Sequence, residues 1–404
     1  MELIELGSIL HMEKGKKPLA QSKEPADGYL PYVDIKAFEQ GIIDNYATTD
    51  KSLLCNDGDL LIVCDGSRSG LTGIAMKGVV GSTLSKIYAD GLTTEYLRYF
   101  IQSKYLLLNT QKKGTGTPHL NANILKASKL VVPSISEQQR IVSRIEELFS
   151  SLDNAVDTLR KTKEQLKVYQ QTVLKEAFEG QLTSHLKIKV TLPWADEGKD
   201  SSLPILPNEW RYVPLKELGD LGRGKSKHRP RNDPKLFIDG KYPFIQTGEV
   251  KSARKYITDY LKQYGDFGLQ QSKLWPKGTL CITIAANIAE TAFLGIDACF
   301  PDSVVGFTPS KNILAEYIRY FIESQKLRLW AFAPATAQKN INLDTLENLI
   351  VPYCDIKEQA AVISEIESRM SVCDSIEHTV NTALAQAEAM RQSILKEAFE
   401  GRLA

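Results

Sequence analysis

Long apolar runs are missing from this chain, and so is any pattern of paired cysteines. No stretch of about 18 apolar residues occurs within its 404 residues, so the sequence predicts no membrane span. The N-terminus, MELIELGSIL, has neither a basic start nor a continuous apolar core, which argues against a signal peptide. The six cysteines form no CxxC pair and indicate reduced, mostly buried thiols in a cytoplasmic protein.

Catalytic and metal-binding patterns are equally scarce. The histidines show no metal-ligand spacing, and the sequence has neither an identifiable Ser/His/Asp grouping nor the Asn-Pro-Pro-Tyr or Asp-Pro-Pro-Tyr motif of an amino-methyltransferase. Asp239, Glu249 and Lys251 loosely match a nuclease carboxylate–lysine set, but they fall where a scaffold segment recurs. The sequence therefore predicts no catalytic residue, no metal and no cofactor bound by this chain itself.

A strong charge of either sign is absent as well. The chain has 50 lysines and arginines against 49 acidic residues, which leaves a formal net charge of +1. This balance neither requires nor excludes nucleic acid, although a strong non-specific binder is usually more basic. The length allows two or three domains, and a hydrophobic content of 43% is ordinary for globular chains.

What the sequence does contain is a helical stretch that occurs twice, at 137–182 and 358–403, each copy ending in LKEAFEG. Apolar residues recur in alternating steps of four and three without an intervening proline, which predicts coiled-coil helices. The predicted seam comprises Ile141, Ile145, Leu148, Leu152, Leu159, Leu166 and Val173 in the first copy and Val362, Ile366, Ile376, Val380 and Ile394 in the second.

Such helices need a partner. Each spans roughly 40 residues, or about 60 Å, and a lone amphipathic helix is not stable in water. The other copy in the same chain is the nearest candidate, and a coiled coil between two chains is the alternative. We favour an antiparallel pair, because it places the end of the first helix beside the start of the second, where the intervening segment must lead.

The segments that precede the two helices also repeat. LIELGSI at 3–9 matches LKELGDL at 215–221, and GDLLIVC at 58–64 matches GTLCITI at 278–284. The pattern predicts an α+β fold with two similar globular domains, each followed by a long helix. The expected boundaries are 1–135 and 207–357 for the domains, 136–182 and 358–404 for the helices, and 183–206 for a polar, proline-bearing linker.

This order of segments resembles the specificity subunits of type I restriction–modification systems, over essentially the whole chain. The resemblance is carried by EQQRIV and EQAAVI at the helix starts, by LKEAFEG at their ends, and by GTGTPHLN and ATAQKNIN, which each precede a strand ending in Val-Pro. Pro207–Trp210 fits the Pro-x-x-Trp that usually opens the family's second domain. The first domain starts at Met1 without that opening, and GTGTPHLN lacks the glutamine of the second copy.

The resemblance implies a non-catalytic DNA-binding subunit. Its two globular units are expected to be target recognition domains that each read one half of a split site, with the helices as spacers. The implied partners are double-stranded DNA and two methyltransferase subunits, which bring S-adenosylmethionine. Motor–nuclease subunits that use ATP can be added to this assembly. A coiled-coil scaffold that binds proteins rather than DNA is the alternative interpretation.

Candidate DNA contacts lie in loops with basic or amide side chains. GDLGRGKS at 219–226 also matches the P-loop pattern, but two prolines in the following KHRPRNDP prevent the helix that a P-loop requires. This loop, DGSRSG at 65–70 and QKKGTGTPH at 111–119 are read as DNA-contacting loops or, alternatively, as ordinary surface turns. The candidates are Lys14, Lys16, Lys17, Arg68, Lys112, Lys113, His119, Arg223, Lys225, Lys227, Arg229, Arg231, Gln338, Lys339 and Asn340.

Overall fold

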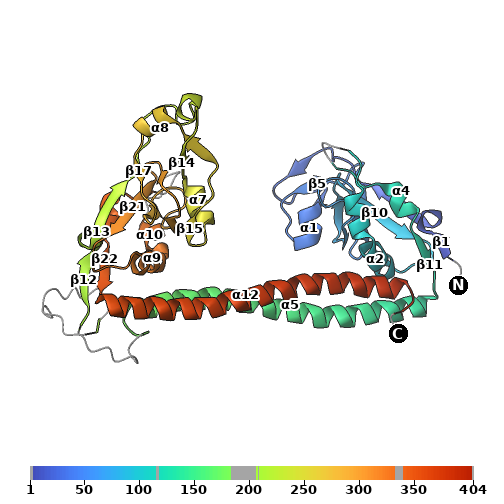
Figure 1. Cartoon of the computed structure of the whole chain (residues 1–404). Coiled ribbons are helices and arrows are strands. Elements are labelled where there is room, and N and C mark those ends of the chain that lie inside the picture. Colours follow the sequence, from blue (N-terminus) through green and yellow to red (C-terminus); the bar gives the residue numbers. More distant parts are fainter. Residues whose placement is uncertain (1–2, 115–117, 183–205, 208, 333–339, 403–404) are drawn as a thin grey trace. The chain divides into compact units, whose positions relative to one another are not determined.

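The chain forms two compact units in the computed structural model, which describes residues 3–114, 118–182, 206–207, 209–332 and 340–402. The first unit comprises residues 1–161 together with 380–404, and the second comprises residues 162–379. Each unit therefore combines one globular domain with a part of both long helices (Figure 1). The two compact units therefore do not coincide with the consecutive segments expected from the sequence, because each long helix is shared between them.

The first globular domain is built on two small sheets that share a buried interior. One sheet has the order β2 (Leu10–Lys14), β10 (Leu84–Ala89), β7 (Leu60–Val63) and β8 (Thr72–Ile74). The other has the order β3 (Gln21–Ser22), β5 (Tyr46–Thr48), β4 (Tyr29–Val33), β9 (Gly78–Val80) and β6 (Leu54–Cys55), and β1 (Leu3–Glu5) pairs with β11 (Lys129–Val131). The helical elements are η1 (Leu6–Ser8), α1 (Ile35–Gln40), α2 (Thr94–Ser103), α3 (Tyr105–Thr110) and α4 (Ala122–Lys126).

The second globular domain repeats this topology. Its larger sheet has the order β13 (Gly219–Arg223), β21 (Val304–Pro309), β18 (Leu280–Thr283), β19 (Thr291–Leu294) and β15 (Tyr256–Ile257). The smaller sheet has the order β16 (Lys262–Tyr264), β14 (Tyr242–Phe244), β20 (Ala298–Cys299) and β17 (Leu274–Trp275), and β12 (Arg211–Pro214) pairs with β22 (Ile350–Tyr353). Its helical elements are α6 (Leu215–Leu218), η3 (Pro234–Leu236), α7 (Thr247–Ser252), α8 (Asp266–Gln270), α9 (Ala315–Ser324), α10 (Lys326–Phe332) and α11 (Leu343–Glu347). The predicted α+β duplication is confirmed.

One match between the copies is shifted relative to the sequence comparison. The sequence places Leu3 opposite Leu215, whereas the structure makes Leu6 the counterpart of Leu215. Their backbone nitrogens donate to equivalent carbonyl oxygens, those of Ser128 at 2.8 Å and Leu349 at 2.9 Å. Both leucines are fully buried. The shift of three residues follows from burial, because Leu3 lies in strand β1 and is exposed, whereas Leu6 reaches the core as Leu215 does.

The two long helices are α5 (Ile135–Phe178) and α12 (Ile356–Phe399), and they run antiparallel. Within the second unit, Lys163 of α5 pairs with Glu377 of α12, with a nitrogen–oxygen distance of 3.5 Å. Further along α5, Glu176 lies 4.0 Å from Arg369. Advancing along α5 therefore means going back along α12, which confirms the antiparallel pair within one chain.

The predicted seam is buried to different degrees. Ile145, Val173, Val362, Ile366, Val380 and Ile394 are buried, and Ile141, Leu148, Leu152, Leu159 and Leu166 are half-buried. Ile376 was predicted to lie in the seam and is instead 40% exposed. The next residue, Glu377, is half-buried and takes part in the ion pair with Lys163. Successive residues of a helix are about 100° apart around its axis, so Glu377 faces α5 where Ile376 was expected to face it. The ion pair with Lys163 thus takes the place of the expected apolar contact.

The repeated LKEAFEG motif ends each helix against the globular domain of the other copy. Phe178, in the first motif, makes edge-on ring contacts with Tyr317 and Phe321 of α9 in the second domain, at centroid distances of 5.1 and 5.3 Å. Phe399, in the second motif, makes the same contacts with α2 of the first domain, where the rings of Tyr96 and Phe100 are 5.1 and 5.4 Å away. The motif is therefore a docking element, and its recurrence reflects two equivalent docking sites.

A buried glutamine joins each globular domain to the helix that follows it. The side chain of Gln138 accepts a hydrogen bond from the Thr93 backbone nitrogen at 2.8 Å and donates to the carbonyl oxygens of Gly91 at 2.7 Å and Pro133 at 3.0 Å. The same three bonds recur in the second copy, where the Gln359 side chain accepts from the Leu314 backbone nitrogen and donates to the carbonyl oxygens of Asn312 and Cys354. Both glutamines are fully buried, which explains why EQ opens both helical segments.

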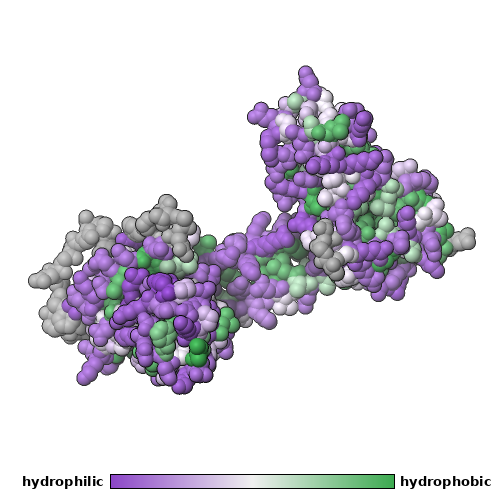
Figure 2. Space-filling model, turned by 90° about the horizontal axis from the view of Figure 1, so that it is seen from above, coloured by the Kyte–Doolittle hydropathy of each residue, from purple (hydrophilic) through white to green (hydrophobic). Residues whose placement is uncertain are grey.

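Hydrophilic residues cover most of the face shown in Figure 2, and apolar residues appear there as scattered patches. None of the described helices is long and apolar enough to cross a membrane.

Candidate nucleic-acid interface

Each globular domain has a cleft at the same place in its fold. The first cleft, of about 430 Å³, lies where the end of β2, the loop after β7 and the turn before α4 meet. The second, of about 350 Å³, lies where β13, the loop after β18 and the turn before α11 meet. An antiparallel β-bridge joins two of the lining residues in each cleft, Asp65 and His119 in the first and Ala285 and Asn340 in the second. The two clefts are therefore counterparts.

Asp65 organises the first cleft. Its carboxylate accepts hydrogen bonds from Lys14 Nζ at 2.8 Å and from His119 Nδ1 at 2.7 Å. Burial alone would raise the pKa of Asp65, but the hydrogen bonds from Lys14 and His119 outweigh burial and hold the pKa below its usual value. Because an ionised carboxylate only accepts hydrogen bonds, His119 Nδ1 carries the hydrogen, and Nε2 remains available to another group.

Asp302 has the corresponding role in the second cleft, with different partners. Arg231 Nη2 donates to both carboxylate oxygens of Asp302 at 2.8 Å, and Arg223 Nε donates to the Asp302 backbone oxygen at 2.9 Å. Asn340 and Ala285 stand where the first cleft has His119 and Asp65. One cleft thus presents an ammonium group and an imidazole, and the other presents two guanidinium groups and an amide.

The other candidate residues lie outside these two arrangements. Lys16, Lys17, Lys225 and Lys227 are exposed and make no ion pair with any carboxylate in the described part of the chain. Arg68 pairs with Glu39, Arg229 donates to the backbone oxygens of Ser226 and His228, and Lys112 donates to the backbone oxygen of Ser67. The backbone of Lys113 pairs with that of His119. Gln338 and Lys339 lie outside the described residues.

The P-loop match has no P-loop geometry. Gly219–Arg223 forms strand β13, and the next helical turn after it is η3, so no helix begins at Lys225. The residues that loosely match a nuclease set also have separate structural contacts. Glu249 accepts a hydrogen bond from the Gln246 backbone nitrogen, and Lys251 donates one to Asn287. Among the described residues, no group of three or more histidine, cysteine, aspartate or glutamate side chains could hold a metal ion.

The two carboxylates that orient the basic side chains were not among the predicted site residues. Asp65 directly follows the apolar strand and opens the DGSRSG loop, a position that could have indicated a role. Asp302 gave no comparable signal, because 79 positions separate it from Arg223 in the sequence.

Two copies of one polar cleft, on two copies of one α+β domain, define a duplicated recognition protein. The family of the type I restriction modification DNA specificity domain matches residues 1–168 and 207–386, and the chain belongs to this family. Catalysis in such systems resides in other subunits, so this chain is a non-catalytic specificity subunit.

Individual relatives agree with this assignment. The MjaVIII specificity subunit of Methanocaldococcus jannaschii is 26% identical over 100% of this chain and 92% of its own length. The EcoBI specificity subunit of Escherichia coli is 24% identical over 85% of this chain and 73% of its own.

Solved structures share the fold. A chain from a study of complex assembly and conformational transition in a type I restriction–modification system matches with a TM-score of 0.75 and 20% identity, over 99% of this chain and 98% of that one. The HsdS subunit of Thermoanaerobacter tengcongensis matches with a TM-score of 0.55 and 19% identity, over 99% and 97%.

Proposed function

We propose that this chain recognises a bipartite DNA site, one half in each globular domain, and directs partner subunits to it. The partners are two methyltransferase subunits, which bind S-adenosylmethionine, and motor–nuclease subunits, which use ATP. The observation that carries the proposal is the repeated cleft, which keeps its place in the fold and changes its hydrogen-bonding groups. Membership of the DNA specificity family supports DNA as the ligand.

The chemistry of the two clefts favours two different half-sites. With Nδ1 bound to Asp65, His119 presents Nε2 to the ligand, and an Nε2 acceptor suits the exocyclic amine of adenine or cytosine. Lys14 beside it offers a donor to guanine. In the second cleft, Arg223 and Arg231 are donors suited to guanine or phosphate, and Asn340 can pair with adenine in both directions.

The helix pair suits a spacer. Each helix has 44 residues, which corresponds to about 66 Å of helix. Because each helix ends against the domain of the other copy, the two domains are tied to the same pair of helices. A fixed number of unread base pairs between the half-sites is the expected consequence.

Single-molecule methylation mapping tests this function. DNA is taken from cells that express the chain with its cognate methyltransferase subunit and from cells that lack only the chain. We expect a split motif with a fixed gap that is methylated only when the chain is present. An absence of chain-dependent methylation, with the methyltransferase shown to be active, would favour a scaffold without DNA specificity.

Exchanging the counterpart residues of the clefts tests the assignment of one half-site to each domain. His119→Asn should change the bases accepted in one half of the motif, and Asn340→His should change those in the other half. His11→Asn is the matched control, because His11 lies in the same domain but stacks on Tyr88 and pairs with Asp90 outside the cleft. A single substitution that altered both halves would contradict the assignment.

A further inference from the structure

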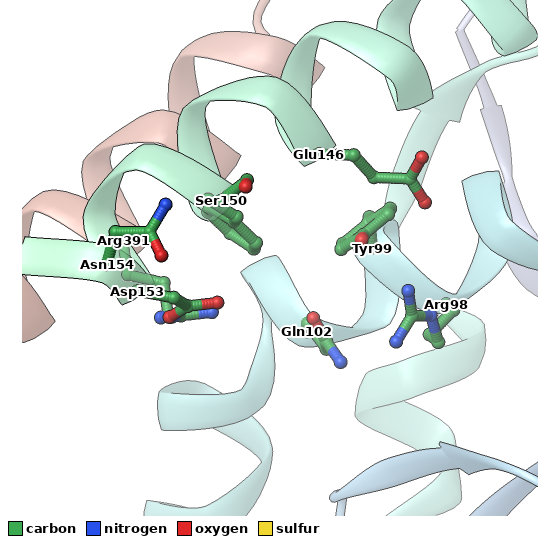
Figure 3. A pocket seen from close by; sticks show the side chains of 9 residues that line it. Arg98, Tyr99, Gln102, Glu146, Ser150, Asp153, Asn154 and Arg391 are labelled. Carbon is green, nitrogen blue, oxygen red and sulfur yellow. The ribbon is translucent and has the colours of Figure 1, made fainter. Parts of the chain in front are cut away.

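A second pocket in the first unit lies apart from the cleft (Figure 3). It has a volume of about 420 Å³ and is bounded by α2, α5 and α12. Glu146, Ser150 and Asp153 line it from α5, Arg98 lines it from α2, and Arg391 lines it from α12. Acidic and basic side chains thus meet here, where a globular domain rests on the helix pair.

The second unit has acidic side chains at the same positions, and its own cations occupy them. Lys255 Nζ lies 2.6 Å from a carboxylate oxygen of Glu316 and 3.3 Å from one of Glu367. The neighbouring Arg254 lies 2.7 Å from Asp374. The hydrogen bond to Glu316 raises the pKa of Lys255, which keeps its ammonium charged. The segment between α7 and β15 thereby fastens the domain to α12.

The first unit keeps these acidic residues. Glu95, Glu146 and Asp153 precede Glu316, Glu367 and Asp374 by the same 221 positions. Glu95 pairs with Arg98 at 2.5 Å, and Asp153 pairs with Arg391. Glu146 forms a hydrogen bond with Tyr99 but has no cation within 4 Å in the described part of the chain. One carboxylate is therefore left without the cation that its counterpart has.

The segment that carries these cations is shorter in the first unit. Tyr32 pairs with Val79 as Phe244 pairs with Cys299, and the helices α1 and α7 that follow have six residues each. Nine residues, 253–261, then separate α7 from β16, whereas five residues, 41–45, separate α1 from β5. None of these five is a lysine or an arginine. The first unit therefore cannot fill the pocket in the way the second does.

We infer that this pocket binds a lysine or arginine side chain of a partner protein, which pairs with Glu146 as Lys255 pairs with Glu367. Because Arg98 and Arg391 are paired with Glu95 and Asp153, the charge left unpaired in the pocket is that of Glu146, which attracts a cation rather than the phosphates of nucleic acid. In the second unit, the ammonium group that pairs with Glu367 belongs to Lys255, a residue of the polypeptide itself. A basic segment of a second protein is therefore the best match for the cation that Glu146 lacks. The inference rests on the proposed function only in that this chain assembles with partner subunits.

Affinity measurements without DNA test the inference. The full chain is immobilised, and its cognate methyltransferase and motor–nuclease subunits are the probes. We expect Glu146→Lys to weaken the binding of one of them about tenfold, which is about 1.4 kcal/mol. Glu147→Lys is the matched control. This substitution makes the same charge change one residue away, at a side chain that does not line the pocket and pairs with Arg144.

A photo-crosslinking residue at Ser150, which lines the pocket, identifies the occupant. We expect crosslinks to a segment of the partner that contains lysine or arginine. Three results would overturn the inference: equal affinity for Glu146→Lys and Glu147→Lys, crosslinks only to a second copy of this chain, or Glu146-dependent binding of Mg²⁺ alone in calorimetry.

The methylated motif separates this inference from the proposed function. At saturating partner concentration, Glu146→Lys should leave the motif unchanged, because the clefts are intact. Loss of partner affinity with an unchanged motif supports the pocket, whereas an altered motif would show that Glu146 acts on DNA recognition and would overturn it.

Discussion

Replacement of Gln138 by leucine should loosen the joint between the first globular domain and α5. The side chain is fully buried and bonds to one backbone nitrogen and two carbonyl oxygens, of Thr93, Gly91 and Pro133. Leucine has a similar volume, so packing changes little, but all three backbone groups lose their partner. The bond to Pro133 is buried and the other two are only partly buried, so we expect a loss of about 1–3 kcal/mol, the cost of one unsatisfied buried group. For a unit of this size, that corresponds to a fall of about 2–12 °C in Tm.

Thermal unfolding and hydrogen exchange measure this effect. Gln139→Leu is the matched control, because Gln139 is adjacent in the same helix and exposed. Exchange should quicken at the start of α2, around Thr93, in Gln138→Leu and not in Gln139→Leu. Gln359→Leu should have the same effect in the second unit, and the two losses should add because they share no partners. If Gln138→Leu and Gln139→Leu unfolded within about 1 °C of each other, the buried bonds would not stabilise the joint as argued.

Three further predictions concern packing, charge and thiol chemistry. Ile145→Ala should destabilise the first unit by about 2–5 kcal/mol, because Ile145 is fully buried. Ile376→Ala should cost less, because Ile376 is 40% exposed, and chemical denaturation can compare the two. Burial raises the pKa of Glu323, so the folded state holds its proton more tightly and stability falls as the pH rises from the usual to the raised value. Glu323→Gln, which copies Gln102 of the first domain, should remove this decline in pH-dependent thermal unfolding. Burial raises the pKa of Cys55 to about 11, so a thiol reagent at pH 8 should label Cys55 only after unfolding, as mass spectrometry can follow.

The repeat and the helix pair could be predicted because their signals are local and periodic. A heptad seam is visible in any short window, and chain connectivity favoured the antiparallel direction. The exposure of Ile376 could not be predicted from the heptad pattern. It depends on how the two helices face each other, since Glu377 rather than Ile376 meets Lys163 of α5.

The residues of the two clefts could likewise be predicted only in part. Lys14, His119, Arg223, Arg231 and Asn340 were candidates because their side chains suit DNA, and the structure gathers them at two equivalent places. Their carboxylate partners could not be predicted, since a loop has no periodicity that would show which distant residue it meets. The contrast at Glu146 was equally hidden, because it depends on cations that only the second domain supplies.

The interleaving of the two units has a consequence for how the protein is made. The core of the first unit includes Ile394, Leu395 and Ala398, and Phe399 closes it against α2. These residues follow the whole second domain in the sequence, so the core of the first unit can be completed only after the second domain has been synthesised. A chain cut short before residue 394 would lack part of the first unit's core as well as the end of α12. Completion of the first unit is thereby coupled to synthesis of the second domain and of α12.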